Sequence, residues 1–589
     1  MVQSSIRNPK IDWAPILKKS CRESLIAVGI FSLIANLLML VPAFFMLNVY
    51  DKAIGSNSVS TLMALSFIAV LMFGGLFAME ALRSKVLVTV SNKIDQIITP
   101  LVYEATLQNA LRVGAHNASA QPINDFFSLR QFVSGNGAIT VFDAPWLPIY
   151  LLVMFMFHPV LGWLGVVAAL LMIIIAIANQ KSTSASLQEA NSLHQHHLGM
   201  ARRDIANTEV AAAMGMLDVI KQSWRTQQDA VLELQSDASN QTGFFSALTK
   251  TFRLGVQSAA IATGAFLVLQ QEISPGMLIA GSILVGRALQ PIELAVGSWK
   301  GFVTAREQYR NLLLLFDQTD WQQDRMSLPK LRGAVSAHQA TIAPPGSQSP
   351  TLCDSTFAIP PGSTCMIIGP SGAGKSTLIR GILGLWPTSS GDIRIDGAEA
   401  SHYNRSELGH QIGYLPQDIE LFAGSVSSNI ARQGEIEPDD VIAAAKDAGI
   451  HDLILTFPNG YDTEIGIEGG VMLSPGLRQR LALARALYRK PVLVVLDEPN
   501  SNLDASGEMA LNGAIKTLKE AGSTVIIVSH RQGAMKLADH VIVVRSGAVV
   551  DSGPRDEVVA RLRNQNASSA ATTQLPKGSG EVTVKTVPV

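Results

Sequence analysis

Long apolar runs dominate the first half of the chain. Six of them approach the roughly 20 mostly apolar residues that a helix needs to cross a bilayer. They cover residues 25–49, 62–82, 142–157, 160–178, 252–270 and 277–296. The pattern predicts an all-α transmembrane domain of six helices over residues 25–316, after an N-terminal segment of residues 1–24.

The second half follows another pattern, in which short runs rich in β-branched residues alternate with helical segments. Examples of the short runs are residues 364–368, 492–496 and 524–528. Such alternation predicts a parallel sheet with crossover helices, so we expect an α/β domain over residues 334–564. A polar stretch with Pro329 and Gly333 indicates a linker at 317–333, and the Ser, Thr, Ala and Gly-rich residues 565–589 predict a disordered tail.

The connections between the apolar runs alternate between short and long. The short ones are the 51–60 turn, the His158-Pro159 break and the 272–276 turn. Basic residues gather in the N-terminal segment and in the long connections, as at Arg83, Lys181 and Arg306. By the positive-inside rule, the N-terminus, the long connections and the second domain are cytoplasmic.

A few charged residues lie in or near the apolar runs. They are Glu80, Asp143, Arg253, Arg287 and Glu293. One interpretation is a polar lining for a transport path, because ionisable groups inside a membrane usually face the bundle interior. The alternative is that they sit at helix ends and extend toward water. The sequence leaves both open.

Composition agrees with a chain that meets both lipid and water. Hydrophobic residues make up 48% of it and charged residues 16%. A formal net charge of -1 gives no reason to expect nucleic acid as a partner. The three cysteines have no metal-ligand spacing, so we expect no thiolate metal site.

A glycine-rich loop carries the first chemistry, directly after the apolar strand that ends at Ile368. Its glycines allow backbone N–H groups to wrap phosphates, and the following helix adds positive potential. Lys375 would reach the β and γ phosphates of ATP, and Ser376 would ligate Mg²⁺. The loop consists of Gly369, Pro370, Ser371, Gly372, Ala373, Gly374, Lys375, Ser376 and Thr377.

Two acids, Asp497 and Glu498, end the apolar strand at 492–496. A carboxylate in this position can hold Mg²⁺, and a second can orient the attacking water. Alone the pair is weak evidence, since strands often end in solvated acids. Together with the phosphate loop it indicates a nucleotide hydrolase.

Motifs spread over 331–561 resemble the cassette of ATP-binding cassette transporters. They are the phosphate loop, Gln417 after Tyr414-Leu415-Pro416, Asp497-Glu498-Pro499, Ser501-Asn502-Leu503-Asp504, and His530 after Val528-Ser529. The resemblance implies that Gln417 senses Mg²⁺ and the membrane domain, that Glu498 is the catalytic base, and that His530 contacts the γ-phosphate. Asp504 would belong to the loop that crosses the dimer interface. The Mg²⁺ ligands implied are Ser376, Gln417 and Asp497.

The signature segment departs from the family's usual Leu-Ser-Gly-Gly-Gln. The chain has Leu473-Ser474-Pro475-Gly476-Leu477. In the family this segment closes on the γ-phosphate bound by the other subunit, so Ser474 and Gly476 are expected nucleotide contacts. Proline is tolerated in the first turn of a helix, but Leu477 lacks the usual polar group, so we expect slower hydrolysis. The usual adenine-stacking aromatic is also replaced, by Ile342-Ala343-Pro344-Pro345-Gly346.

The membrane half resembles exporters of type I protein secretion, of the protease and lipase exporter kind. The resemblance rests on Leu47-Asn48-Val49-Tyr50-Asp51-Lys52, on Phe142-Asp143-Ala144-Pro145-Trp146-Leu147-Pro148 and on His158-Pro159. It implies a homodimer in a bacterial inner membrane, joined to a periplasmic adaptor (membrane fusion) protein and an outer-membrane channel. The secreted protein cargo would carry an uncleaved C-terminal signal, because the 24 residues before the first apolar run leave no room for a leader-cleaving peptidase domain.

Two alternatives remain at this point. The same architecture could export a small amphiphile or a lipid. The altered signature also suits a weakly hydrolysing subunit that regulates a heterodimer.

Overall fold

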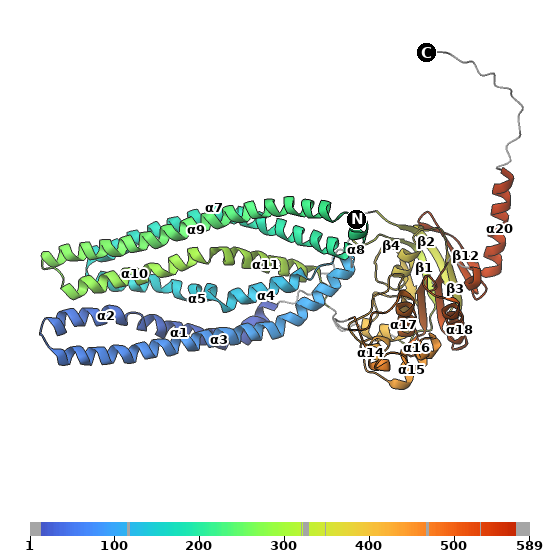
Figure 1. Cartoon of the computed structure of the whole chain (residues 1–589), viewed down its shortest axis with the longest axis horizontal. Coiled ribbons are helices and arrows are strands. Elements are labelled where there is room, and N and C mark those ends of the chain that lie inside the picture. Colours follow the sequence, from blue (N-terminus) through green and yellow to red (C-terminus); the bar gives the residue numbers. More distant parts are fainter. Residues whose placement is uncertain are drawn as a thin grey trace, which may run out of the picture. The chain divides into compact units, whose positions relative to one another are not determined.

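The computed structural model describes residues 13–114, 118–319, 321, 329–347, 349–466, 470–529 and 532–572. Contacts divide the chain into two compact units (Figure 1). One comprises residues 1–109 and 119–321, and the other 110–118 and 322–589.

In the first unit, all the regular elements among the described residues are helices. Its elements are α1 (Trp13–Leu38), α2 (Val41–Asn48), η1 (Val49–Ile54), α3 (Val59–Val113), α4 (Gln121–Ser134), α5 (Asn136–Asp143), η3 (Ala144–Trp146), α6 (Leu147–Phe157), α7 (Pro159–Ala206), α8 (Thr208–Ala213), α9 (Leu217–Leu269), α10 (Pro275–Gly297) and α11 (Trp299–Gln318). Among the described residues, six helical segments are long and apolar enough to cross a membrane, which confirms the six predicted spans.

Three of these helices are much longer than a membrane is thick. α3, α7 and α9 have 55, 48 and 53 residues. At about 1.5 Å per residue each reaches roughly 70 to 80 Å, whereas the hydrocarbon core is about 30 Å thick. The helices therefore continue well beyond the apolar runs. Figure 1 shows α7 and α9 running side by side.

The short turns between the apolar runs make contacts between hairpins. Asp51, in the irregular turn η1, accepts a hydrogen bond from the Gly276 N–H at 2.9 Å and another from the Ser274 hydroxyl. A Cβ on Gly276 would lie 2.5 Å from Leu47 O. The two segments of the backbone therefore approach too closely for any residue but glycine at this position. Asp51 thus caps the N-terminus of α10 from the first hairpin.

The His158-Pro159 break makes a second contact of this kind. His158 Nδ1 accepts from the Val160 N–H at 3.2 Å and so caps α7, while Nε2 lies 3.0 Å from Glu272 Oε2. An accepting Nδ1 leaves the proton on Nε2, which can donate to the Glu272 carboxylate. The 272–276 turn is therefore bound to both other turns.

A buried polar network joins α1, α3, α5 and α6. The Arg83 guanidinium is 2.9 Å from Asp143 Oδ1 and 2.7 Å from Glu80 Oε2. Asn36 donates to Asp143 at 2.8 Å and accepts from the Tyr150 hydroxyl at 3.1 Å. We expected Arg83 to be one of the basic residues of a cytoplasmic connection, but only 3% of it is exposed, because Asp143 and Glu80 supply its counter-charge.

The described residues of the second unit form three sheets. A six-stranded sheet has the order β12-β11-β3-β10-β9-β6, a four-stranded one β2-β1-β4-β5, and a small one β7-β8. In the six-stranded sheet all neighbours are parallel except β11 and β12. The predicted parallel sheet is confirmed, and the antiparallel four-stranded sheet is an addition that the sequence pattern did not reveal.

The bounds of the strands are β1 (Val335–Ile342), β2 (Leu352–Ile359), β3 (Thr364–Ile368), β4 (Thr388–Ile395), β5 (Ala398–Glu399), β6 (Ile412–Leu415), β7 (Gly424–Ser425), β8 (Glu464–Ile465), β9 (Leu493–Asp497), β10 (Thr524–Val528), β11 (His540–Arg545) and β12 (Ala548–Pro554). The helices are α12 (Lys375–Ile382), α13 (Arg405–Gln411), α14 (Val426–Ile430), α15 (Pro438–Asp447), α16 (His451–Ile454), η4 (Gly460–Asp462), α17 (Pro475–Leu487), α18 (Ala505–Glu520), α19 (Gln532–Met535) and α20 (Arg555–Thr572).

The expectation of disorder from residue 565 onward is wrong for the first part of the tail. Helix α20 continues to Thr572, because the Gln and Ala residues of 565–572 favour helix despite the polar composition of this stretch. The rest of the predicted tail, residues 573–589, lies outside the described residues.

The network around Arg83 yields a prediction about stability. In Arg83→Met the Asp143 carboxylate keeps its buried position without its counter-charge, which costs about 3 to 5 kcal/mol. The double variant Arg83→Met/Asp143→Leu removes both charges and is expected to be the more stable of the two. The midpoint temperatures of thermal unfolding in detergent show which of the two variants is more stable. A double variant that unfolds at a lower temperature than Arg83→Met would contradict it.

Candidate nucleotide site

The glycine-rich loop leads from the buried strand β3 into helix α12. Gly369, Gly372 and Gly374 have φ values of 158°, 76° and 102°. A Cβ on Gly369 would lie 2.1 Å from Val544 O, and one on Gly374 would lie 3.1 Å from Thr351 O. The left-handed turns and these close approaches explain why glycine occupies the positions. They also aim the free amides at the start of α12 toward the loop, where an anion is favoured.

Lys375 begins α12 and is almost fully buried. Its ammonium donates to the carbonyl oxygens of Gly369 and Pro370, each at 2.9 Å. These bonds hold the positive charge in the concavity of the loop, where the phosphates of a nucleotide would lie.

Asp497 ends strand β9, which neighbours β10 in the sheet, and is 2% exposed. Its carboxylate is hydrogen-bonded to the Ser376 side chain. Within the described part of the chain, its Oδ1 is buried without a hydrogen-bond partner. Burial raises the pKa of Asp497 above its usual value, and the Ser376 bond opposes the shift only in part.

Glu498 follows with a φ of 49°, which is uncommon for a residue with a side chain. Its N–H donates to Val528 O at 3.0 Å, and this bond fixes the backbone at the edge of the sheet. Gln417, after strand β6, donates from Nε2 to Glu498 Oε2 at 3.3 Å. Three strand ends therefore bring Gln417, Glu498 and the phosphate loop to the same edge.

The signature turn opens helix α17. Ser474 is its N-cap and accepts from the Leu477 N–H at 3.4 Å, and Pro475 takes the first helical position without disrupting the helix. A Cβ on Gly476 would come within 3.1 Å of Asn502 O. Leu477, which replaces the polar residue of the family pattern, packs against the apolar core that includes Leu473 and Leu481.

Gln479 is a site residue that sequence reasoning missed. Its side chain is 2% exposed, and its Oε1 accepts from the Asn502 N–H at 2.9 Å. Its Nε2 donates to the carbonyl oxygens of Glu498 and Pro499. One glutamine of the signature helix therefore closes the loop that directly follows Glu498. Its place two residues after Leu477 was the only sequence signal.

Arg432 is a second missed residue, at the end of α14. Its guanidinium donates to Arg485 O at 3.0 Å and Ala486 O at 3.2 Å, the last carbonyls of α17, and to Ile412 O at 2.9 Å. Burial lowers its pKa to about 10, so the group stays charged at neutral pH. Arg432 therefore fixes the far end of the signature helix to strand β6.

Asp504 is placed at the start of α18. Its carboxylate accepts from the Gly507 N–H at 2.9 Å and pairs with Arg480 of the signature helix. The hydrogen bond that the Asp504 carboxylate accepts from the Gly507 N–H is the main reason that the pKa of Asp504 lies below its usual value. His530 lies outside the described residues.

Residues 342–346, which replace the usual adenine-stacking aromatic, end strand β1 and enter a turn. Ile342 is fully buried in β1, so it offers no face to a base. The following residues form a turn in which the Ser347 N–H donates to Pro344 O at 3.0 Å. None of these groups stacks on a base as an aromatic ring does.

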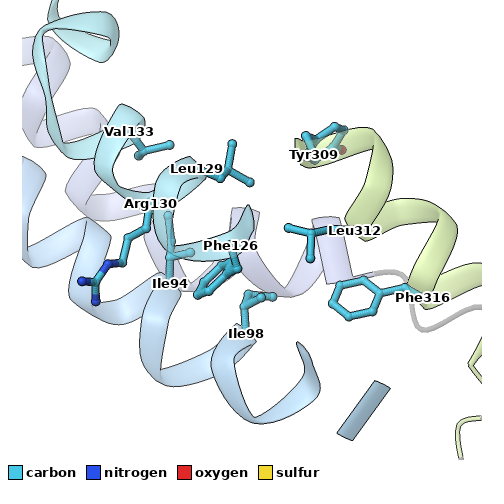
Figure 2. A pocket seen from close by; sticks show the side chains of 9 residues that line it. All are labelled: Ile94, Ile98, Phe126, Leu129, Arg130, Val133, Tyr309, Leu312 and Phe316. Atoms are coloured by element: carbon cyan, nitrogen blue, oxygen red, sulfur yellow. The ribbon is translucent and has the colours of Figure 1, made fainter. Parts of the chain in front are cut away.

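A cavity of about 200 Å³ lies in the helical unit, between α3, α4 and α11 (Figure 2). Figure 2 shows Phe126, Leu312 and Phe316 around it, with the Arg130 side chain directed away from the apolar group. That guanidinium is instead 2.9 Å from Asp95 and lies over the Phe127 ring. An apolar cavity of this kind offers nothing to a nucleotide.

Comparison with known proteins gives consistent matches over almost the whole chain. Residues 352–501 match the ABC transporter family, and residues 25–290 match the ABC transporter transmembrane region. The type I secretion system ATP-binding protein PrsD of Rhizobium meliloti is 40% identical over 92% of this chain and 94% of its own. The cyclolysin secretion/processing ATP-binding protein CyaB of Bordetella pertussis is 28% identical over 90% of this chain and 75% of its own.

The fold has a close counterpart among solved structures. A bacterial Atm1-family ABC exporter with ATP bound superposes with a TM-score of 0.81 at 21% identity, covering 95% of this chain and 99% of that one.

A cassette joined to six membrane-spanning helices defines a multi-pass ATP-binding cassette transporter, in which ATP binding and hydrolysis are coupled to transport. Within that class, the chain belongs to the exporters of type I protein secretion.

Gln479 yields a prediction about turnover. Gln479→Leu removes the bonds that close the loop after Glu498, each worth about 0.5 to 1.5 kcal/mol. We expect ATP turnover to fall about tenfold while the affinity for a fluorescent ATP analogue changes little. Gln411→Leu is the matched control, because Gln411 accepts from the Leu331 N–H at 2.8 Å, outside the site. Equal loss of turnover in both variants would contradict a role in the site.

Proposed function

We propose that the chain energises export of a protein with an uncleaved C-terminal signal across a bacterial inner membrane. It would act as a homodimer joined to a periplasmic adaptor protein and an outer-membrane channel. The observation that carries this proposal is the 40% identity, along nearly the whole length of both chains, to a type I secretion system ATP-binding protein. The cassette and the N-terminus would be cytoplasmic.

The site suits Mg²⁺ as the companion of ATP. Asp497 Oδ1 is buried without a partner in the described residues and lies on the carboxylate bonded to Ser376, so two oxygen ligands of the kind Mg²⁺ prefers are adjacent. Ser376, Asp497 and Gln417 would hold the ion. When bound, Mg²⁺ supplies charge neutralisation at the β and γ phosphates.

The side chains divide the remaining work of hydrolysis. The loop Gly369 to Thr377 would bind the phosphates through its amides, with Lys375 moving from its two carbonyl partners to the γ-phosphate. Glu498 would orient the attacking water and accept its proton. Gln417 would hold the Glu498 carboxylate, and His530 would contact the γ-phosphate.

The signature turn would act on the nucleotide of a second copy of the chain. Ser474 and Gly476 begin α17, where the free amides of a helix N-terminus favour an anion. Asp504 would lie in the loop that crosses between the copies. Leu477 packs into its own core, so the amides and the Ser474 hydroxyl would carry this contact without the usual side-chain amide.

The raised pKa of Asp497 yields a prediction about pH. Its carboxyl keeps a proton at a higher pH than a solvated aspartate, and only the ionised form can ligate a metal, so metal binding releases a proton. The Mg²⁺ concentration needed for ATP binding is therefore expected to rise as pH falls from about 7 to about 5. This Mg²⁺ concentration is measured at each pH by titrating Mg²⁺ into the chain with a fluorescent ATP analogue. In Asp497→Asn this part of the pH dependence should disappear, and an unchanged dependence would contradict the assignment.

Cargo-dependent hydrolysis tests the proposed function. The purified chain, reconstituted in lipid, is given the C-terminal segments of secreted proteins encoded beside it. We expect one of them to stimulate steady ATP hydrolysis. Glu498→Gln should reduce turnover at least about 100-fold while ATP binding persists.

Three outcomes would contradict the proposal. Stimulation by lipids or small amphiphiles, with none by any protein segment, would favour the alternative cargo. Absence of hydrolysis by the wild-type chain alone, restored by mixing with a related subunit, would favour the regulatory half of a heterodimer. Hydrolysis that survives in Glu498→Gln would remove Glu498 from its role.

A further inference from the structure

Three of the charged residues singled out in the membrane half line one polar cavity. The cavity has a volume of about 340 Å³ and lies between α9 and α10. Its polar lining consists of Arg253 and Gln257 from α9, and Arg287, Gln290 and Glu293 from α10. The sequence left open whether such residues face a transport path or extend from helix ends. Their convergence on one cavity supports the first interpretation.

The depth of the cavity makes this polarity informative. Arg287 lies twelve residues after Pro275, where α10 begins. At about 1.5 Å per residue this is roughly 18 Å along the helix, near the middle of a hydrocarbon core about 30 Å thick. An arginine there is costly against lipid and is retained where it faces protein or water.

The charges in the cavity do not balance. Arg253 and Glu293 form an ion pair, with the guanidinium Nε bonded to Oε2. Arg287 has no carboxylate within ion-pair distance among the described residues. Its Nη1 reaches only Gln290 Oε1 at 3.1 Å and Met39 Sδ at 3.7 Å. Two guanidinium groups and one carboxylate leave one uncompensated positive charge.

Further hydrogen-bonding groups remain available beside that charge. Nε and Nη2 of Arg287, and the side-chain amide of Gln257, make no hydrogen bond within the described part of the chain. Gly286 lies directly beside the Gln257 amide, since a Cβ built on it would be in ordinary van der Waals contact with Gln257 Oε1, at 3.5 Å. The cavity thus offers a fork of N–H donors for a carboxylate and an amide that can both donate and accept.

We propose that this cavity binds acidic segments of an extended polypeptide in transit, with Arg287 holding a carboxylate and Gln257 a peptide group. This deepens the proposed function and rests on it, because it names the chemistry of the cargo that the membrane half accepts. A single carboxylate suits the single free charge. The Gln257 amide beside it can both donate and accept, as a peptide group requires, whereas the phosphodiester of a lipid headgroup offers only acceptors.

Direct binding of a model peptide tests the proposal without a known cargo. The probe is a fluorescent twelve-residue peptide of Glu, Gly and Ser with blocked ends, compared with its Gln counterpart by anisotropy on the full chain in neutral lipid nanodiscs. We expect the Glu peptide to bind wild type about tenfold more tightly, the loss for one charged hydrogen-bonded pair. Arg287→Gln should abolish this preference.

Two more variants separate recognition from folding. Arg202→Gln removes the same charge from an exposed position on α7, outside the cavity, and should keep the preference. Gln257→Leu should weaken the Glu and Gln peptides equally, about threefold, because it removes a contact to the peptide backbone. If Arg287→Gln does not fold, the peptide affinities of Gln257→Leu still test the proposal. Unchanged binding of both peptides in that variant contradicts it.

Further results of these experiments would contradict the proposal or one part of it. Equal affinity for both peptides in wild type, or a preference that persists in Arg287→Gln, overturns the proposal. Loss of the preference when phosphatidylglycerol replaces neutral lipid would assign the cavity to a lipid headgroup. Another such result is that a protein segment stimulates hydrolysis equally in wild type and Arg287→Gln, with the same half-maximal concentration. That result would contradict a role of the cavity in binding cargo but would agree with the proposed function. If the Glu peptide is preferred but no protein segment stimulates hydrolysis, the result contradicts the proposed function and leaves the peptide-binding role of the cavity in place.

Discussion

Lipid cannot satisfy a backbone or side-chain polar group, and this constraint governs how the helical unit is built. At three of the interruptions between its helices, a side chain supplies a hydrogen-bond partner or a counter-charge. Asp51 caps α10, His158 caps α7 and contacts Glu272, and Asp143 at the broken α5 and α6 junction is neutralised by Arg83. These are residues of the three motifs on which the family resemblance of the membrane half rested. Their physical role is to close the breaks that a helical membrane protein needs in order to turn.

The cassette follows a comparable rule with glutamine and arginine side chains. Gln479 satisfies the backbone of the loop after Glu498, and Arg432 satisfies the carbonyls at the other end of α17. Both ends of the signature helix are thereby attached to the strands that carry Gln417 and Glu498. The rigidity of this frame is consistent with the replacement at Leu477. The residue gains apolar packing where a polar contact is lost, and the helix start keeps its geometry.

The sequence predicted those features that depend on local pattern. Six apolar runs became six spans because membrane thickness sets their length, and the glycine spacing placed the phosphate loop because few other residues adopt its backbone. It did not predict features that depend on distant partners. The burial of Arg83 needs Asp143, sixty positions away, and the role of Gln479 needs Asn502. The antiparallel sheet escaped notice because its strands expose alternate polar residues and lack a continuous apolar run.

The 272–276 turn bonds to both of the other short turns, through Asp51 and through His158. Within one copy of the chain, the three short turns are therefore joined to one another by side-chain contacts. The hairpins at this end of one chain can separate only if these bonds break, so a movement there is expected to carry the three turns together.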